Sequence, residues 1–236
     1  QFTIMPILGF SLASLFNFPL EIAAGIILIG SSPSGLASNV MAYLAKANIA
    51  LSVTLTAVAT LVAPIMTPFL MKTLAGSFVP IDFLAMMTSI FKIVIVPVLL
   101  GLIFNYFFHG KAKWLDKAMP IISMAGIGFI IMIITAAGRD DLLSIGLLLI
   151  LAAIIHNLLG YVFGYWGCRI FGMCEQDCRT IAFEVGMQNG GLATGIALEM
   201  GKISTVGLAP AIFGPWMNIS GSSLATWWRD KEPKKK

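Results

Sequence analysis

Apolar runs long enough to cross a lipid bilayer follow one another along nearly the whole chain. A membrane-spanning helix takes about 20 mostly apolar residues, and the hydropathy pattern predicts such helices near 2–18, 20–45, 48–71, 82–108, 114–137, 141–168, 178–203 and 205–228. Only 11% of the 236 residues are charged, whereas soluble domains carry roughly 25%. The sequence therefore predicts an all-α integral membrane protein of about eight spans, with the lipid bilayer as its solvent.

Two of the predicted helices contain residues that a continuous membrane helix tolerates poorly. The second includes "GSSPSGLASN" (30–39), where Pro33 interrupts the ladder of backbone hydrogen bonds. The seventh includes "IAFEVGMQNGG" (181–191), where Glu184 brings a charge to a depth that costs at least ~2.5–3.5 kcal/mol on insertion scales. Irregular backbone survives in the membrane only where it is buried in protein or lines a cavity. Both helices are therefore predicted to be broken around a polar site.

The two broken segments resemble each other. Residues 32–46, "SPSGLASNVMAYLAK", align without gaps on residues 188–202, "QNGGLATGIALEMGK". Four predicted spans separate the copies, so they cross the membrane in opposite directions. Paired interrupted helices in two halves of a chain are typical of inverted-repeat secondary transporters, whose binding sites lie where the breaks cross.

The distribution of Lys and Arg predicts the orientation. Eleven of these residues lie on the side of the C-terminus, three lie on the other side, and Lys92 lies inside a span. An excess of basic residues marks the cytoplasmic side. We expect a multi-pass protein of the inner (plasma) membrane with a basic cytoplasmic tail at 231–236. That tail is read as a topology anchor, and no nucleic-acid partner is expected.

The carboxylate of Glu184 has no obvious basic partner in the predicted spans. Lys92 is expected near one end of its helix, where its ammonium can reach the interface. A cation from solution is then the natural partner of Glu184. Carboxylate, hydroxyl and carbonyl oxygens suit a hard cation, and the absence of clustered carboxylates argues against Ca²⁺ and Mg²⁺. Sodium is the predicted ion, and no organic cofactor is expected.

Other polar residues in the spans are open to two readings. Asn105 and Asn157 either bond a neighbouring helix or belong to the site, and removal of the Asn157 side chain is expected to have little effect. His156 is expected to face the bundle as a polar core residue. The hydroxyls of residues 52, 54 and 56 either serve the site or bond their own helix carbonyls.

Three motifs carry a resemblance to a known family: "GLASNVMAYLAKANIALSVTLT", "EVGMQNGGLA" and "FGPWMNISGSSLA". Together they resemble the bile acid:sodium symporter family, and the resemblance covers essentially the whole chain. It implies a fold of ten helices in two inverted five-helix repeats, of which this chain supplies helices three to ten. Residues 1–75 and 139–230 would form the core domain, and residues 80–138 would form panel-domain helices. A chain without the first two panel helices is not expected to transport alone.

The resemblance also implies binding residues. The first sodium site would comprise Ser38, Asn39, Ser52, Thr56 and Glu184. The second would comprise Gln1, Glu184, Val185, Met187 and Gln188. Asn189 and Asn218 would contact the organic anion. Close relatives tend to carry a hydroxyl where this sequence has Leu36, which leaves the polar contacts of the substrate open.

The predicted function is alternating-access symport of two Na⁺ with one organic anion, either a bile acid or a small organic acid such as pantoate. An oligomer is not required. Two alternatives stay open: a related carrier without sodium coupling, and a non-transporting membrane sensor module. An enzyme is not expected and no catalytic residues are assigned, because neither histidine has a carboxylate at helical spacing and no metalloprotease motif is present.

Overall fold

The computed structural model describes residues 1–108 and 113–231, and in these ranges every regular element is a helix. The predicted all-α class is therefore confirmed. The helices are α1 (Ile4–Leu15), α2 (Leu20–Ser31), α3 (Ala37–Leu44), α4 (Ile49–Leu70), α5 (Phe83–Ile90), α6 (Val96–Phe108), α7 (Lys113–Ala137), α8 (Arg139–Ile170), α9 (Glu175–Gly186), α10 (Gly190–Glu199) and α11 (Leu208–Arg229). Most of the basic tail at 231–236, and residues 109–112 of the predicted panel, lie outside the described residues.

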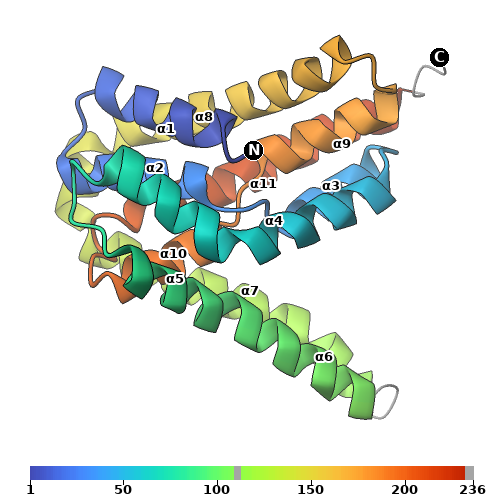
Figure 1. Ribbon diagram of the computed structural model, residues 1–236, viewed down its shortest axis with the longest axis horizontal. Helices are drawn as coiled ribbons and strands as arrows, with labels where there is room; N and C mark the ends of the chain where they lie inside the picture. Colours follow the sequence, from blue (N-terminus) through green and yellow to red (C-terminus); the bar gives the residue numbers. More distant parts are fainter. Residues whose placement is uncertain (109–112, 232–236) are drawn as a thin grey trace.

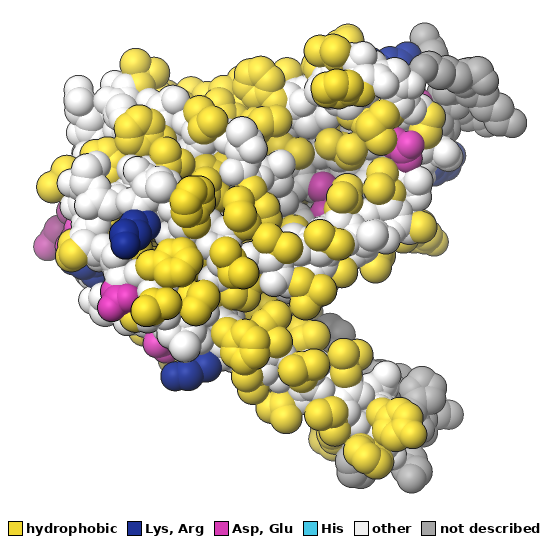
Figure 2. Space-filling model, in the orientation of Figure 1, with side chains coloured by type: hydrophobic (Ala, Val, Ile, Leu, Met, Phe, Trp, Pro, Cys, Tyr) yellow, Lys and Arg dark blue, Asp and Glu magenta, His cyan; other side chains and the backbone are white. Residues whose placement is uncertain are grey.

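Three helical stretches have the length and apolar composition that a membrane crossing requires: Ile49–Ala75, Phe83–Phe107 and Arg139–Ile170. Two of them are longer than a single α-helix because π-helical turns, Met71–Ala75 and Phe91–Ile95, continue α4 and α5. Large hydrophobic side chains are exposed along them, and Figure 2 shows such side chains spread over the visible face, most continuously over α5 and α6. An apolar exterior of this kind is expected where a protein faces lipid.

Both predicted breaks are present. The chain leaves α2 at Ser31 and begins α3 at Ala37, and it leaves α9 at Gly186 and begins α10 at Gly190. Pro33 lies in the first break, where its missing N–H removes a helical hydrogen bond. The second break is shorter, because the Asn189 side chain accepts a hydrogen bond from the Leu192 N–H and so caps the new helix.

The two breaks satisfy each other's backbone. Asn189 N–H donates to the Pro33 carbonyl at 2.8 Å, and Gly35 N–H donates to the Met187 carbonyl at 3.3 Å. Ser34 and Gln188 form an isolated antiparallel bridge between them. A Cβ on Gly35 would come within 2.8 Å of the Gln188 carbonyl oxygen, so only glycine permits this approach. The predicted contact between the breaks is confirmed.

Several predicted boundaries differ from the structure. The first helix was expected to reach residue 18 but ends at Leu15, because Asn17 takes a left-handed conformation (φ 49°) and Pro19 follows it. The seventh segment was expected to begin at 178 but begins at Glu175, since acidic residues favour the positive end of a helix. The placement of Lys92 near a helix end was wrong. It lies well inside the stretch Phe83–Phe107, on the π-helical turn.

Figure 1 shows most helices gathered in one bundle, from which α6 and much of α7 extend outward. The larger hydrophobic core lies inside that bundle and includes Phe183, Met187, Phe213 and Trp228. A second cluster includes Ile22 and Ile26 of α2 and Leu149 of α8, together with side chains of α1, α7 and α11. Residues of all four half-helices, α2, α3, α9 and α10, belong to the larger core.

Candidate functional site

The carboxylate of Glu184 is surrounded by hydroxyl groups from two other helices. Ser38 Oγ and Ser52 Oγ lie 2.6 and 2.7 Å from Glu184 Oε1, and Thr56 Oγ1 lies 2.9 Å from Oε2. All four side chains are buried, and Glu184 is only 3% exposed. None of the ion pairs in the described part of the chain involves Glu184. The charge is thus held by neutral oxygen groups alone.

Helix geometry explains why these residues meet. Ser52 and Thr56 are four residues apart on α4, so they share one face, and that face is directed at Glu184 on α9. The hydroxyl of Thr54, on another face, bonds the Ala50 carbonyl of its own helix at 2.8 Å. The structure thus places the Ser52 and Thr56 hydroxyls at Glu184 and bonds the Thr54 hydroxyl to its own helix.

The cluster contains more acceptor oxygens than protons. Each of the three hydroxyls carries one proton, yet each lies within 3.1 Å of at least two acceptors. One acceptor is always Glu184, and the other is the Gly35 carbonyl or the Asn39 amide oxygen. A hydroxyl donates only one proton, so each hydroxyl can form a hydrogen bond to only one of its neighbouring acceptor oxygens. The remaining oxygen–oxygen contacts have no proton between them. An oxygen-lined pocket with one carboxylate is chemically suited to a monovalent hard cation.

The second predicted set of residues lies beside the first, at the break itself. Gln1 Nε2 donates to Gln188 Oε1 at 3.0 Å and to the Ser32 carbonyl at 2.7 Å. Gln188 Nε2 donates to the Val185 carbonyl at 2.6 Å. A cavity of about 300 Å³ has Gln1, Glu184 and Val185 in its wall. The carbonyl of Met187 accepts from Gly35 N–H and keeps a second lone pair.

A larger cavity, of about 520 Å³, lies between α7 and the α10–α11 region. Four isoleucines of α7 line one side, namely Ile127, Ile130, Ile131 and Ile133, and the polar lining includes Thr194 and Asn218. Asn218, one of the two residues predicted to contact the substrate, thus lines this cavity. Asn189 is not among the lining residues, because its side chain caps α10, although the next residue, Gly190, is.

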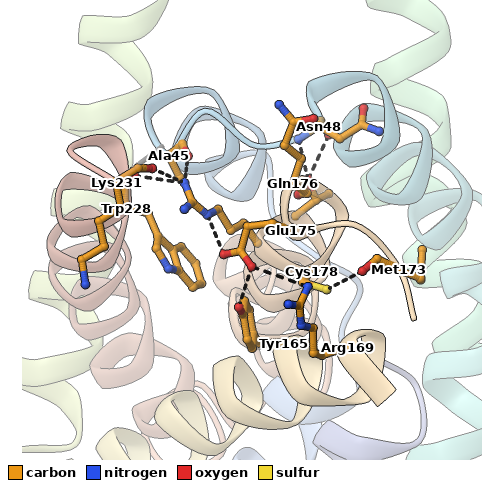
Figure 3. Close-up of polar contacts among 12 residues, drawn as sticks. Ala45, Asn48, Tyr165, Arg169, Met173, Glu175, Gln176, Cys178, Trp228 and Lys231 are labelled. Atoms are coloured by element: carbon orange, nitrogen blue, oxygen red, sulfur yellow. Dashed lines mark hydrogen bonds and ion pairs between the residues drawn. The ribbon is translucent and has the colours of Figure 1, made fainter. Parts of the chain in front are cut away.

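A buried ionic cluster at the start of α9 was not foreseen from the sequence. Arg179 is 2% exposed and donates to Glu175 at 3.1 Å. It also donates to the backbone carbonyls that end α3 and α11, at Ala45 and Trp228, both at 3.0 Å. Tyr165 of α8 donates to Glu175 at 2.8 Å, as Figure 3 shows. This cluster joins α9, which carries Glu184, to α3, which carries Ser38.

Two polar residues of α8 have the helix-bonding role that was one of their predicted readings. His156 is buried, and its Nε2 lies 2.9 Å from the Met5 carbonyl. Asn157 Nδ2 donates to the Gly186 carbonyl at 2.9 Å. The three cysteines are free, with Cys168 and Cys178 buried and Cys174 exposed. No group of three His, Cys, Asp or Glu side chains among residues 1–108 and 113–231 is arranged to hold a metal.

The comparison with protein families agrees with this geometry. The sodium bile acid symporter family matches residues 1–145. The chain belongs to that family. Among curated members and relatives, the uncharacterised sodium-dependent transporter YocS of Bacillus subtilis (strain 168) is 42% identical over 236 residues, which cover 100% of this chain and 73% of YocS.

Plant relatives of this symporter family are more distant. The chloroplastic protein named probable sodium/metabolite cotransporter BASS1 is 35% identical in Arabidopsis thaliana over 234 residues, covering 99% of this chain and 58% of the relative. Its counterpart in Oryza sativa subsp. japonica is also 35% identical, over 236 residues, which cover 100% of this chain and 58% of the relative. The chain thus spans less than two thirds of these plant relatives. Together with its apolar helices, membership of the family makes it a multi-pass membrane protein of a transporter family.

Proposed function

We propose that this protein is a sodium-coupled symporter of an organic anion that works by alternating access. Relatives named as sodium-dependent or sodium/metabolite transporters support the use of sodium as the coupling ion. Transport of a solute, with no chemical change to it, agrees with the absence of a catalytic motif in the sequence.

The observation that carries the proposal is the oxygen-rich pocket around Glu184. The first sodium ion is assigned to Ser38, Asn39, Ser52, Thr56 and Glu184. The hydroxyls and the carboxylate lie 2.6–3.1 Å apart, so a cation placed among them would replace contacts that their protons cannot satisfy. One carboxylate supplies too little charge for a typical Ca²⁺ site, which favours Na⁺.

A second sodium ion is assigned to Gln1, Glu184, Val185, Met187 and Gln188. Support comes from the cavity that Gln1, Glu184 and Val185 line together, and from the carbonyls that the break frees from helical bonding. Two Na⁺ with one monoanion would carry one net charge per cycle, worth ~2.3 kcal/mol per 100 mV of membrane potential.

The organic anion is assigned to the cavity between α7 and α10–α11, with Asn218 in its wall and Asn189 beside it. The long apolar lining favours an anion with a hydrophobic body, which includes bile acids, and its volume also admits a small acid such as pantoate. The N-terminus of α10 faces the cavity through Gly190 and would attract a carboxylate.

The movement is assigned to two units, a core of residues 1–75 and 139–230 and a panel that includes 80–138. The outward extension of α6 and α7 from the bundle supports this division (Figure 1), and the paired breaks support an inverted repeat. We place the C-terminus in the cytoplasm on the distribution of Lys and Arg, and we assign the protein to the plasma membrane. No oligomer is required by the proposed sites.

Counterflow in proteoliposomes tests the proposal. Vesicles loaded with unlabelled acid should accumulate the labelled acid in Na⁺ but not in K⁺, and the Glu184→Gln variant should lose that difference. Equal counterflow in both salts would identify a carrier without sodium coupling. Sodium-dependent binding without any counterflow would instead support a sensor module.

A further inference from the structure

Asn157 lies next to the second break, although no sodium or substrate contact is assigned to it. Its side chain is fully buried, and its Nδ2 donates to the carbonyl of Gly186, the last residue of α9, at 2.9 Å. Ser220 Oγ of α11 donates to Asn157 Oδ1 at 2.6 Å and so fixes the orientation of the amide. Tyr161 OH lies 3.2 Å from the same serine hydroxyl.

The other half of the chain contains a matching arrangement. The ungapped offset that aligns residues 32–46 on 188–202 also carries Gln1 onto Asn157. Gln1 Nε2 donates to the carbonyl of Ser32, which immediately follows α2, at 2.7 Å. In each half, therefore, an amide at the aligned position donates to a backbone carbonyl close to the break. The two carbonyls lie two aligned positions apart, because the offset pairs Gly186 with Gly30 and not with Ser32.

Holding the Gly186 carbonyl has a direct consequence for its neighbours. The carbonyls of Val185 and Met187 belong to the peptide groups on either side, and each peptide group is rigid. Once the Gly186 peptide plane is fixed, the directions of the flanking carbonyls depend only on the dihedrals of the residues between them. Loss of the amide donor would release this constraint. The Val185 carbonyl would then be held only by the Gln188 side chain, and the Met187 carbonyl only by the Gly35 N–H.

We infer that Asn157 is a positioning residue that sets the direction of the Val185 and Met187 carbonyls and thereby the sodium affinity of the second site. This inference rests on the proposed function, because it assigns those carbonyls to Na⁺. A purely structural interhelical hydrogen bond would affect unfolding alone, whereas a positioning role also changes the sodium dependence of transport.

The test compares Asn157→Leu, Ser220→Ala and Tyr161→Phe in the complete transporter. Leucine has the same number and branching of side-chain heavy atoms as asparagine but no donor, so the Na⁺ concentration for half-maximal uptake should rise about fivefold to tenfold, as expected for a lost hydrogen bond to a carbonyl that is left buried. Ser220→Ala should raise it about twofold to threefold. Tyr161→Phe removes a hydroxyl from the same cluster but keeps the Asn157–Gly186 bond, and it should leave the sodium dependence unchanged.

Two further measurements separate positioning from general damage. The KM for the acid at saturating Na⁺ should stay within about twofold of the unmodified protein, and the stabilisation of the thermal midpoint by Na⁺ should shrink, since ligand stabilisation follows affinity. If Asn157→Leu does not fold, Ser220→Ala decides by the same readouts. Unchanged sodium dependence in the folded variants, alongside its loss in Glu184→Gln, would overturn this inference alone. Unchanged sodium dependence in Glu184→Gln would overturn the proposed function.

Discussion

The Thr56 hydroxyl lies 2.9 Å from one carboxylate oxygen of Glu184 and 3.1 Å from the other, across 128 residues of sequence. Thr56 belongs to a continuous helix and Glu184 to a broken one, so the contact joins α4 to the half-helix α9. The contacts of the carboxylate therefore depend on the relative positions of α4 and α9, which are far apart in the chain. Any ion that binds between them stabilises their association.

Glu184→Gln is expected to abolish sodium coupling. The substitution keeps the size of the side chain but removes the charge that offsets cation desolvation. Opposite charges ~4 Å apart at an effective dielectric constant of ~20 interact by about 4 kcal/mol, and half of that corresponds to a roughly thirtyfold loss of sodium affinity. Uptake as a function of Na⁺ measures the change. The exposed Glu199 provides the control, since Glu199→Gln should retain the original sodium dependence.

Thr56→Val should weaken sodium binding less than Glu184→Gln does. Valine keeps the branched shape but removes one neutral oxygen, a loss on the order of 1 kcal/mol, or about fivefold in affinity. Thr54→Val is the matched control, because the Thr54 hydroxyl bonds its own helix. Sodium titrations of the two variants should therefore diverge. Identical titrations would place Thr56 outside the ion site.

Gly35→Ala is expected to separate the two breaks. Its Cβ would lie 2.8 Å from the Gln188 carbonyl, a backbone atom that has little room to move. We expect a loss of about 1–3 kcal/mol in the free energy of unfolding, as for other overpacked sites, together with weaker sodium binding. Gly167→Ala, where a Cβ meets nothing within 4 Å, should leave both quantities nearly unchanged. Thermal unfolding with and without Na⁺ measures both.

Arg179→Gln is expected to destabilise the fold by up to roughly 3 kcal/mol, because it removes the buried partner of Glu175 and leaves only Arg169, 3.9 Å away, to offset that charge. It also leaves the carbonyls of Ala45 and Trp228 without their shared donor. Arg179→Lys keeps the charge but not the planar arrangement of donors, so its stability should lie between that of Arg179→Gln and that of the unmodified protein. A thermal midpoint of Arg179→Gln equal to that of the unmodified protein would contradict this account of the cluster.

Glu175 should make stability fall in acid. Burial acts to raise the pKa of its carboxyl, but hydrogen bonds from Tyr165 and Arg179 and the charges of Arg179 and Arg169 hold that pKa below its ordinary value. A carboxyl with a depressed pKa contributes stability above its unfolded pKa of about 4.3, and the contribution disappears as pH falls through the folded pKa. Below about pH 4 the thermal midpoint should therefore decline less steeply for Glu175→Gln than for the unmodified protein.

Much of the fold could be predicted because a membrane helix requires a long run of apolar residues, which is visible in the sequence. Pro33 and Glu184 mark the breaks for the same reason, since each has a large cost inside a helix or a membrane. The contact between the breaks followed from their similarity. The helix ends were harder to predict. The turn at Asn17 depends on a left-handed backbone conformation, which asparagine can adopt but which the sequence does not require.

The site could be predicted only in part. Ser52 and Thr56 are four residues apart, which places them on one face of a helix. The family resemblance assigned both to the first sodium site. Arg179 reads in the sequence as one more basic residue near a membrane surface, because its partners include the backbone carbonyls of Ala45 and Trp228, which have no sequence signature. For Asn157 a bond to a neighbouring helix was one of the two predicted readings, but its acceptor, the Gly186 carbonyl, has no sequence signature. The expectation that its removal would have little effect is therefore replaced by the inference drawn above. The placement of Lys92 did not follow from the predicted span, because 82–108 itself puts residue 92 well away from both ends.

The backbone bonds between the breaks have a consequence for biogenesis. Asn189 supplies the donor for the Pro33 carbonyl, and Met187 the acceptor for Gly35 N–H, yet the ribosome makes the first break long before the second. During that interval the nascent chain holds unpaired peptide groups at a depth where lipid offers no substitute. We therefore expect the first half to remain near the aqueous interior of the insertion machinery until the second half is synthesised. Both halves would then enter the bilayer late and together.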